Sequence, residues 1–122
     1  KKRVLLVEDE QQLNDLYKQL LEGDGYDVQS SLNGKEAFEI LEEGGFDLVL
    51  LDIMLPGMDG LEILEALGKK APSKPNKSIV LLTNLAENET IARALKNGVH
   101  GYIIKSRFSP DEFLTEVKKH FV

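Results

Sequence analysis

Cysteine is absent from this chain of 122 residues, and no apolar segment is long. Without cysteine the protein has no disulfide framework, no thiolate zinc site and no cysteine nucleophile. A membrane-spanning helix needs roughly 18 predominantly apolar residues, and the sequence contains neither such a run nor a signal-peptide pattern. These absences predict a cytoplasmic protein that does not associate with a membrane.

A long basic segment is also missing. The chain has 21 Asp and Glu against 15 Lys and Arg, which gives a formal net charge of −6. Such an acidic chain is poorly suited to direct nucleic acid binding. The charge is uneven, because residues 93–122 contain six basic and three acidic side chains. The first part of the chain therefore suits cations and the last part suits acidic partners.

The chain does contain a regular alternation of apolar blocks and helical patterns. Residues 4–7, 48–51 and 79–82 are apolar without polar alternation, which is typical of strands buried on both faces of a parallel sheet. The more polar residues 28–31 and the short segment 102–104 predict two edge strands. The length supports one hydrophobic core, so we expect residues 1–122 to form a single domain.

Between the predicted strands, apolar residues repeat with the period of a helix. Leu13, Leu16, Tyr17, Leu20 and Leu21 predict a first helix that ends at Gly23. Similar patterns predict four more helices. One is capped by Asn33, one ends near Gly68, one is capped by Asn88 and carries Ile91, Ala92 and Leu95 on its apolar face, and one opens with the capping box from Ser109 to Glu112. Five strands alternating with five helices predict a doubly wound α/β fold, because right-handed crossovers place helices on both faces of the sheet.

Polar side chains stand at the carboxyl ends of the predicted strands, where parallel sheets bind their ligands. Glu8 and Asp9 follow the first strand, Asp52 follows the third, Thr83 ends the fourth, and Lys105 follows the fifth. If the strand order is 2-1-3-4-5, the first and third strands are neighbours. The three acids then converge at one edge of the sheet.

Converging carboxylates raise each other's pKa unless a cation is present. Oxygen ligands without His or Cys suit a hard cation, and Mg²⁺ is favoured because it accepts a few carboxylates and keeps its remaining waters. A lysine and a hydroxyl opposite the metal complete a phosphoryl-binding site in which a carboxylate acts as nucleophile. Each residue alone is commonly a turn former, a helix cap or a solvated charge. Their joint placement favours phosphoryl chemistry.

Four segments carry a more specific signal: VED at 7–9, LDIMLPGMDG at 51–60, LT at 82–83 and GYIIK at 101–105. With these segments the chain resembles the receiver domain of two-component response regulators, from about Val4 to Lys119. The resemblance implies a flavodoxin-like fold with five helices around a five-stranded parallel sheet of order 2-1-3-4-5.

The resemblance also implies a phosphoacceptor. Asp52 is expected to take a phosphoryl group from the phosphohistidine of a histidine kinase or phosphotransfer protein. The implied Mg²⁺ ligands are Glu8, Asp9, Asp52 and the backbone carbonyl of Met54. The chain would then be a signalling domain rather than an enzyme, although it would assist its own phosphorylation and dephosphorylation.

The resemblance also implies a conformational switch that responds to phosphorylation. Lys105 is expected to pair with the phosphoryl oxygens, and Thr83 to bond to them and move inward. Tyr102 would follow into the vacated space. This motion remodels the face of the fourth helix, fifth strand and fifth helix, through which the family controls an output domain, a partner or a homodimer.

Three features depart from the family's commonest pattern. Lys105 is usually followed by proline in a cis peptide, but here Ser106 follows. A cis bond before a residue other than proline costs about 2.5–4 kcal/mol, so the sequence leaves cis and trans open. Asn84 is bulkier than the usual residue at its position and is expected to narrow access to the phosphoryl group. Met54 and Leu85 are apolar and are expected to hinder an attacking water.

Two other functions fit parts of the pattern. A haloacid-dehalogenase-like phosphatase also uses a strand-end Asp and Mg²⁺, but it needs a second Asp where this chain has Met54. A degenerate receiver acting as a constitutive protein-interaction module would lack Asp52, Thr83, Lys105 or one of the acidic pair, and all are present. Nucleotide binding is disfavoured because neither G-x-x-x-x-G-K nor G-x-G-x-x-G occurs.

Overall fold

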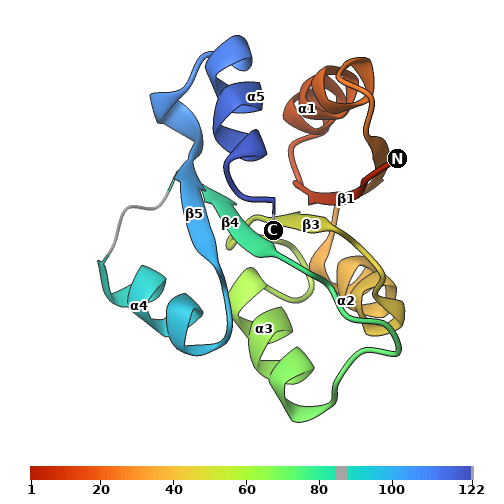
Figure 1. The fold of residues 1–122 in the computed structure, drawn as a ribbon. Coiled ribbons are helices and arrows are strands. Elements are labelled where there is room, and N and C mark those ends of the chain that lie inside the picture. The colour runs from red at the N-terminus through yellow and green to blue at the C-terminus, as the bar shows by residue number, and fades with distance from the viewer. Residues whose placement is uncertain (85–87, 122) are drawn as a thin grey trace.

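A computed structural model describes residues 1–84 and 88–121. Five strands of this part of the chain form one parallel sheet: β1 (Arg3–Val7), β2 (Asp27–Ser31), β3 (Leu48–Leu51), β4 (Ile79–Thr83) and β5 (Gly101–Ile104). Their order is β2-β1-β3-β4-β5, with β2 and β5 at the edges (Figure 1). The predicted strands and their order are confirmed.

Helices cover both faces of the sheet. The α-helices are α1 (Gln11–Gly23), α2 (Gly34–Glu43), α3 (Gly60–Lys69), α4 (Asn88–Lys96) and α5 (Pro110–Lys118), and a 3₁₀ turn, η1 (Lys105–Arg107), follows β5. Figure 1 shows α1 and α5 on one side of the sheet and α2, α3 and α4 on the other. The doubly wound α/β architecture is therefore confirmed.

The alternation of side chains along each strand divides the core into two clusters. Val4 and Leu6 of β1 belong to the cluster under α1 and α5, whereas Leu5 and Val7 belong to the one under α2, α3 and α4. Both faces of β1 are buried, which explains why its sequence is apolar without alternation. The sheet is thus a buried central layer, and its carboxyl edge carries the polar residues of the candidate site.

The predicted face of α1 packs on the sheet with one exception, since Leu13 and Leu20 are partly buried against the same core cluster as Tyr17 and Leu21. Leu16 is exposed, and Asn14, Tyr17 and Leu21 are the buried residues of the helix. The Asn14 amide donates to two backbone carbonyls at the carboxyl ends of β1 and β2, those of Glu8 (2.9 Å) and Ser31 (3.2 Å). Burying a polar group is tolerable when it is hydrogen-bonded in this way.

The face that helix α4 turns inward differs in part from the predicted one. Ile91 and Ala94 are buried, whereas Ala92 and Leu95 of the predicted apolar stripe lie on the exposed side. The described part of the helix begins at Asn88, and the predicted role of Asn88 as a cap rests on a side chain outside the described part of the structure. The exposed Leu95, with 49% of its surface accessible, leaves an apolar side chain on the outside of the molecule.

Side-chain caps fix where α2, α3 and α5 begin. Asn33 accepts from the Glu36 N–H, and Ser109 forms the predicted capping box with Glu112. A further capping box between Asp59 and Glu62 starts α3 and was not predicted. No helix in the described parts of the chain is long and apolar enough to cross a membrane.

Candidate functional site

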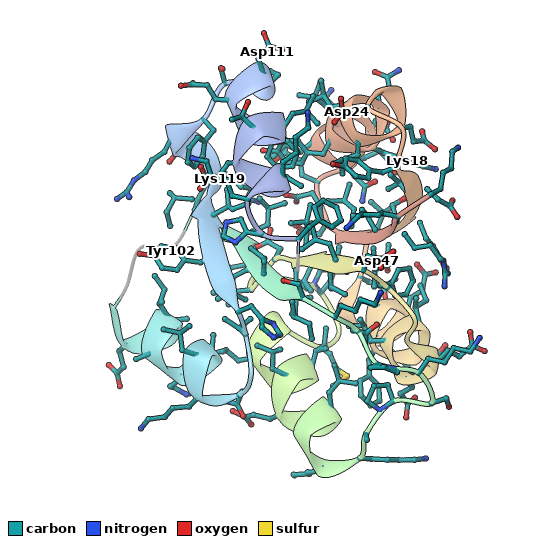
Figure 2. The ribbon with its side chains drawn as sticks, viewed as in Figure 1. Lys18, Asp24, Asp47, Tyr102, Asp111 and Lys119 are labelled. Carbon is teal, nitrogen blue, oxygen red and sulfur yellow. The ribbon has the colours of Figure 1, made fainter. Side chains whose placement is uncertain are left out.

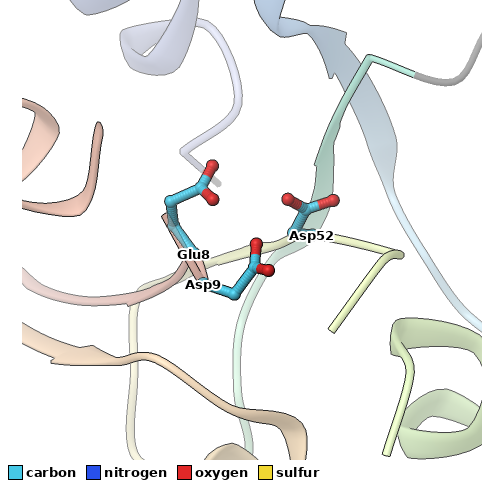
Figure 3. Close-up of side chains that lie close together, drawn as sticks. All are labelled: Glu8, Asp9 and Asp52. Carbon is cyan, nitrogen blue, oxygen red and sulfur yellow. The ribbon is translucent and has the colours of Figure 1, made fainter. Parts of the chain in front are cut away.

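The sheet brings three acids together at its carboxyl edge. Glu8 and Asp9 follow β1, and Asp52 follows the neighbouring β3. The Glu8 N–H donates to the Ser31 backbone carbonyl at 3.1 Å, and the Asp52 N–H donates to the Val7 backbone carbonyl at 3.1 Å. The hydrogen bonding of the parallel sheet therefore continues past the strand ends. One carboxylate oxygen from each acid lies within 4.8 Å of the others (Figure 3).

The donor set of this cluster fits a hard divalent cation. All three groups are carboxylates, without a histidine, and Figure 3 shows the Asp9 and Asp52 carboxylates facing a common space. Glu8 and Asp52 are buried, whereas Asp9 is exposed. A cation held here would have protein ligands on its inner side and open solvent on the side of Asp9.

Lys105 bridges the two buried acids. Its Nζ donates to Glu8 Oε1 at 2.6 Å and to Asp52 Oδ2 at 2.8 Å. The lysine side chain is largely buried, and it enters the site from η1, directly after β5. Two carboxylates from neighbouring strands are thus neutralised in part by one ammonium group.

The pKa values of these groups follow from burial and from this bridge. Burial raises the pKa of Glu8, and the hydrogen bonds from Lys105 and from the Glu10 N–H oppose the rise without cancelling it. Burial alone would lower the pKa of Lys105, but its bonds to Asp52 and Glu8 outweigh burial and raise that pKa. Lys105 therefore remains a cation beside Asp52.

The loop after β3 holds Asp52 from its other side. The Met54 N–H donates to Asp52 Oδ1 at 3.3 Å, and the Gly60 N–H donates to the Ile53 carbonyl at 2.8 Å. A Cβ at Gly60 would lie only 2.5 Å from the Asp52 carbonyl oxygen, so only glycine allows α3 to start this close to the site. Gly57 has a φ of +83°, which also favours glycine.

Thr83 and Tyr102 lie on the two strands beyond β3. Thr83 is buried at the end of β4, one strand away from Asp52. Tyr102 lies on the edge strand β5, opposite Leu81 in register, and 43% of its surface is exposed. Figure 2 shows Tyr102 at the outer edge of the molecule. The residues predicted for chemistry thus lie at the carboxyl ends of four adjacent strands, whereas Tyr102 lies within β5, the last of these strands.

The three departures from the family pattern have distinct structural outcomes. The described residues contain no cis peptide, so the Lys105–Ser106 peptide is trans, and Lys105 nevertheless reaches both acids. Asn84 is exposed and bonds to the backbone of Ser106. Met54 exposes 64% of its surface beside Asp52, whereas Leu85 lies outside the described residues.

Sequence reasoning missed Asn14 as part of the site. Its amide holds the backbone of Glu8 against the end of β2, which fixes where the acidic pair begins. A signal was available, because Asn14, Tyr17 and Leu21 share one helical face at spacings of three and four residues. A polar residue on a buried face indicates a specific hydrogen-bond partner.

Comparisons with known proteins identify the family that the chain resembles. The family model described as the response regulator receiver domain matches residues 4–118. The transcriptional regulatory protein SrrA of Staphylococcus aureus is 33% identical over 115 residues, which cover 94% of this chain and 46% of SrrA. The chain thus spans about half the length of this curated relative.

Solved structures give the same result at the level of the fold. A CheY-like response regulator receiver domain from Methanospirillum hungatei is 34% identical, with a TM-score of 0.82 over 97% of this chain and 91% of that one. The BeF3-activated N-terminal receiver domain of Klebsiella pneumoniae RstA is 32% identical, with a TM-score of 0.82 over 98% of this chain and 97% of that one.

Proposed function

Because the chain belongs to the response regulator receiver domain family of two-component systems, we propose that it is a phosphorylation-dependent switch whose phosphoacceptor is Asp52. One observation carries this assignment. Asp52 is a buried member of the acidic cluster, with the Lys105 ammonium 2.8 Å from one of its oxygens. A nucleophile beside a fixed cation is the arrangement that transfer of an anionic phosphoryl group requires.

The donor in this proposal is the phosphohistidine of a histidine kinase or a phosphotransfer protein. An Asp52 carboxylate oxygen attacks phosphorus, the phosphorus–nitrogen bond breaks, and the histidine ring leaves with the electron pair. Asp52 becomes an acyl phosphate. Lys105 neutralises charge on the phosphoryl oxygens, and the Thr83 hydroxyl hydrogen-bonds to them.

Magnesium is the cofactor that we propose for this site. Glu8, Asp9, Asp52 and the backbone carbonyl of Met54 would hold it, with Glu8 acting directly or through water. When bound, Mg²⁺ supplies positive charge beside the transferring phosphoryl oxygens. The support is the donor set: three carboxylates with oxygen atoms within 4.8 Å of one another.

The output in this proposal is a change in the face formed by α4, β5 and α5. Thr83 moves toward the phosphoryl group, Tyr102 turns inward, and the altered face controls an output domain, a partner or a second copy of the chain. We propose that residues 1–122 form one receiver domain, located in the cytoplasm. In this role the domain is a signal carrier rather than an enzyme, and it does not itself bind nucleic acid.

Intact-mass measurement after incubation with Mg²⁺ and acetyl phosphate tests the proposal. The wild type should gain one phosphoryl group, Asp52→Asn should gain none, and the exposed-site control Asp111→Asn should behave as the wild type. Excess chelator should abolish the gain. A full gain in Asp52→Asn would place the acceptor elsewhere, and no gain in the wild type would favour the alternative of a degenerate receiver that acts as a constitutive interaction module.

A further inference from the structure

We propose that Asn84 is a positioning residue for Lys105, acting through one hydrogen bond between the segments that follow β4 and β5. This inference rests on the proposed phosphoryl-transfer function of the site. Asn84 Oδ1 accepts from the Ser106 backbone N–H at 3.0 Å. Asn84 directly follows Thr83, and Ser106 directly follows Lys105. The bond therefore links the neighbours of two proposed phosphoryl-binding residues.

The donor in this bond is a group that its own helix cannot satisfy. Ser106 lies in the first turn of η1, where backbone N–H groups have no intrahelical acceptor. Ile104, which precedes η1, provides no side-chain cap. The Asn84 side chain thus does for η1 what an N-terminal cap does for an α-helix, but it comes from the residue directly after the neighbouring strand β4.

Fixing Ser106 restricts the backbone from which the Lys105 side chain extends. Lysine has a long, flexible side chain, and its ammonium here fits between two carboxylates at 2.6 and 2.8 Å. A shift of the η1 backbone would move the ammonium away from at least one of them. Because the Asn84 side chain, directly after β4, holds the η1 turn, the Lys105 ammonium keeps its position although no proline follows Lys105.

Both partners are needed for the contact. A proline at position 106 would have no N–H to donate, and a small side chain at position 84 would have no acceptor in reach. These are two of the positions at which the sequence departs from the commonest pattern of the family. The structure accounts for the two departures together, as the donor and the acceptor of one hydrogen bond.

Three variants test the role of Asn84. Asn84→Ala removes the acceptor, Asn84→Asp retains an oxygen acceptor, and Ser106→Ala removes the hydroxyl while retaining the N–H. Nuclear magnetic resonance of the unphosphorylated protein reports hydrogen exchange of the Ser106 amide and of the Lys105 ammonium. The rate of mass gain with Mg²⁺ and acetyl phosphate reports phosphorylation. Denaturant unfolding reports global stability.

We expect Asn84→Ala to speed both hydrogen exchanges and to slow phosphorylation, each by about two- to tenfold, the range for loss of one hydrogen bond. Its denaturation midpoint should stay near that of the wild type, since Asn84 is exposed. Asn84→Asp should restore the protection of Ser106 and Lys105. Ser106→Ala should match the wild type in all three measurements.

Two results would overturn the inference. One is wild-type exchange of the Lys105 ammonium in Asn84→Ala. The other is phosphorylation of Asn84→Ala at the wild-type rate. If the wild type accepts no phosphoryl group, the proposed function fails, but the exchange of Ser106 and Lys105 still establishes or refutes the positioning role of Asn84.

Discussion

Lys105 has a structural role in addition to its proposed chemical one. Its ammonium lies between two buried carboxylates, those of Glu8 and Asp52. A buried ion pair adds little net stability over an apolar contact, but removal of one partner leaves a buried charge uncompensated. In the protein without a bound cation, Lys105 is therefore the group that makes burial of both acids tolerable.

We expect Lys105→Met to lower the free energy of unfolding by about 3 kcal/mol in the presence of chelator, because two buried acids lose their counterion. Added Mg²⁺ should recover part of this loss. Urea denaturation provides the measurement. Lys119→Met is the matched control, since Lys119 pairs with Glu116 at an exposed position and its loss should cost less than about 1 kcal/mol. Equal losses in the two variants would contradict the structural role of Lys105.

The side chain of Met54 is expected to affect how fast water hydrolyses the phosphorylated form. Its largely exposed side chain lies beside Asp52 and offers an attacking water no strong hydrogen-bond acceptor or donor. Met54→Asn should therefore shorten the lifetime of the phosphorylated form by about two- to tenfold, the effect of one hydrogen bond on a rate. The decay of the phosphorylated mass after removal of the donor measures this lifetime. Met54→Leu should leave it unchanged, and equal lifetimes for all three proteins would refute the shielding argument.

At the scale of elements, β1 and β3 are tied at the end of the sheet opposite the site. The Arg3 N–H donates to Asp47 Oδ2 at 2.8 Å, and the Asp47 N–H donates back to the Arg3 carbonyl at 2.8 Å. Lys77, which precedes β4, pairs with Asp47 at 3.3 Å. Asp47 thus connects the starts of the strands whose far ends carry Glu8 and Asp52.

The bond from Arg3 lowers the pKa of Asp47 below its ordinary value of 3.8, and Lys77 adds to the effect. Because the pKa of Asp47 is lower in the folded chain than in the unfolded chain, the contact contributes its full stabilisation at a pH above the unfolded pKa. This stabilisation is lost as the pH falls through the folded pKa. Asp47→Ala should lower the free energy of unfolding by about 1 kcal/mol at neutral pH. Asp47→Asn keeps an acceptor for Arg3, so it should lose less stability than the wild type between pH 5 and pH 3. Identical pH profiles for wild type and Asp47→Asn, by urea denaturation, would contradict this account.

The elements themselves were largely predictable because their signals are local. The uninterrupted apolar runs of β1, β3 and β4 reflect burial on both faces, and the Ser109 capping box marks the start of α5. The exposure of Leu16 on α1 and the inward face of α4 were not predictable from apolar spacing alone. Asn14 replaces an apolar residue in the core because two carbonyls need its amide, and Leu95 remains outside although its type suggests burial.

At the scale of the whole molecule, the meeting of Glu8, Asp9 and Asp52 follows from topology. Once β1 and β3 are neighbours in a parallel sheet, residues after both strands must lie at the same edge. The bridge from Lys105 to two acids depends instead on the η1 turn and on side-chain geometry. Neither is encoded by a local pattern, and the same is true of the contact between Asn84 and Ser106.

The positive charge of the last part of the chain is largely engaged in ion pairs. Arg93 pairs with Glu65 at 3.0 Å, Lys118 with Asp24 at 3.0 Å, and Lys119 with the neighbouring Glu116. The sequence suggested that this charge attracts acidic partners. The exposed apolar side chains of Leu95 and Tyr102 now distinguish the α4, β5 and α5 face more clearly than its charge does.

Coupling between the site and this face requires a group that contacts the phosphoryl group better in one conformation than in the other. Thr83 meets the positional requirement, because it is buried at the end of β4, between the strand that leads to Asp52 and the strand that carries Tyr102. In this structure, 43% of the surface of Tyr102 is exposed. An inward turn on phosphorylation would therefore change its solvent contact substantially.

We expect phosphorylation to reduce the solvent exposure of the Tyr102 ring in the wild type, measured as the broadening of its resonances by a soluble paramagnetic probe. Thr83→Ala should still accept a phosphoryl group on Asp52, since Lys105 and the acids remain. Its Tyr102 ring should stay exposed, because the hydroxyl that favours the inward state is missing. Thr115→Ala is the control, since that hydroxyl bonds within α5 to the Asp111 carbonyl and should not affect the switch. A full loss of Tyr102 exposure in phosphorylated Thr83→Ala would show that another residue carries the signal. Chemical-shift changes confined to the loops around residues 8, 52 and 83 would place the output on another face.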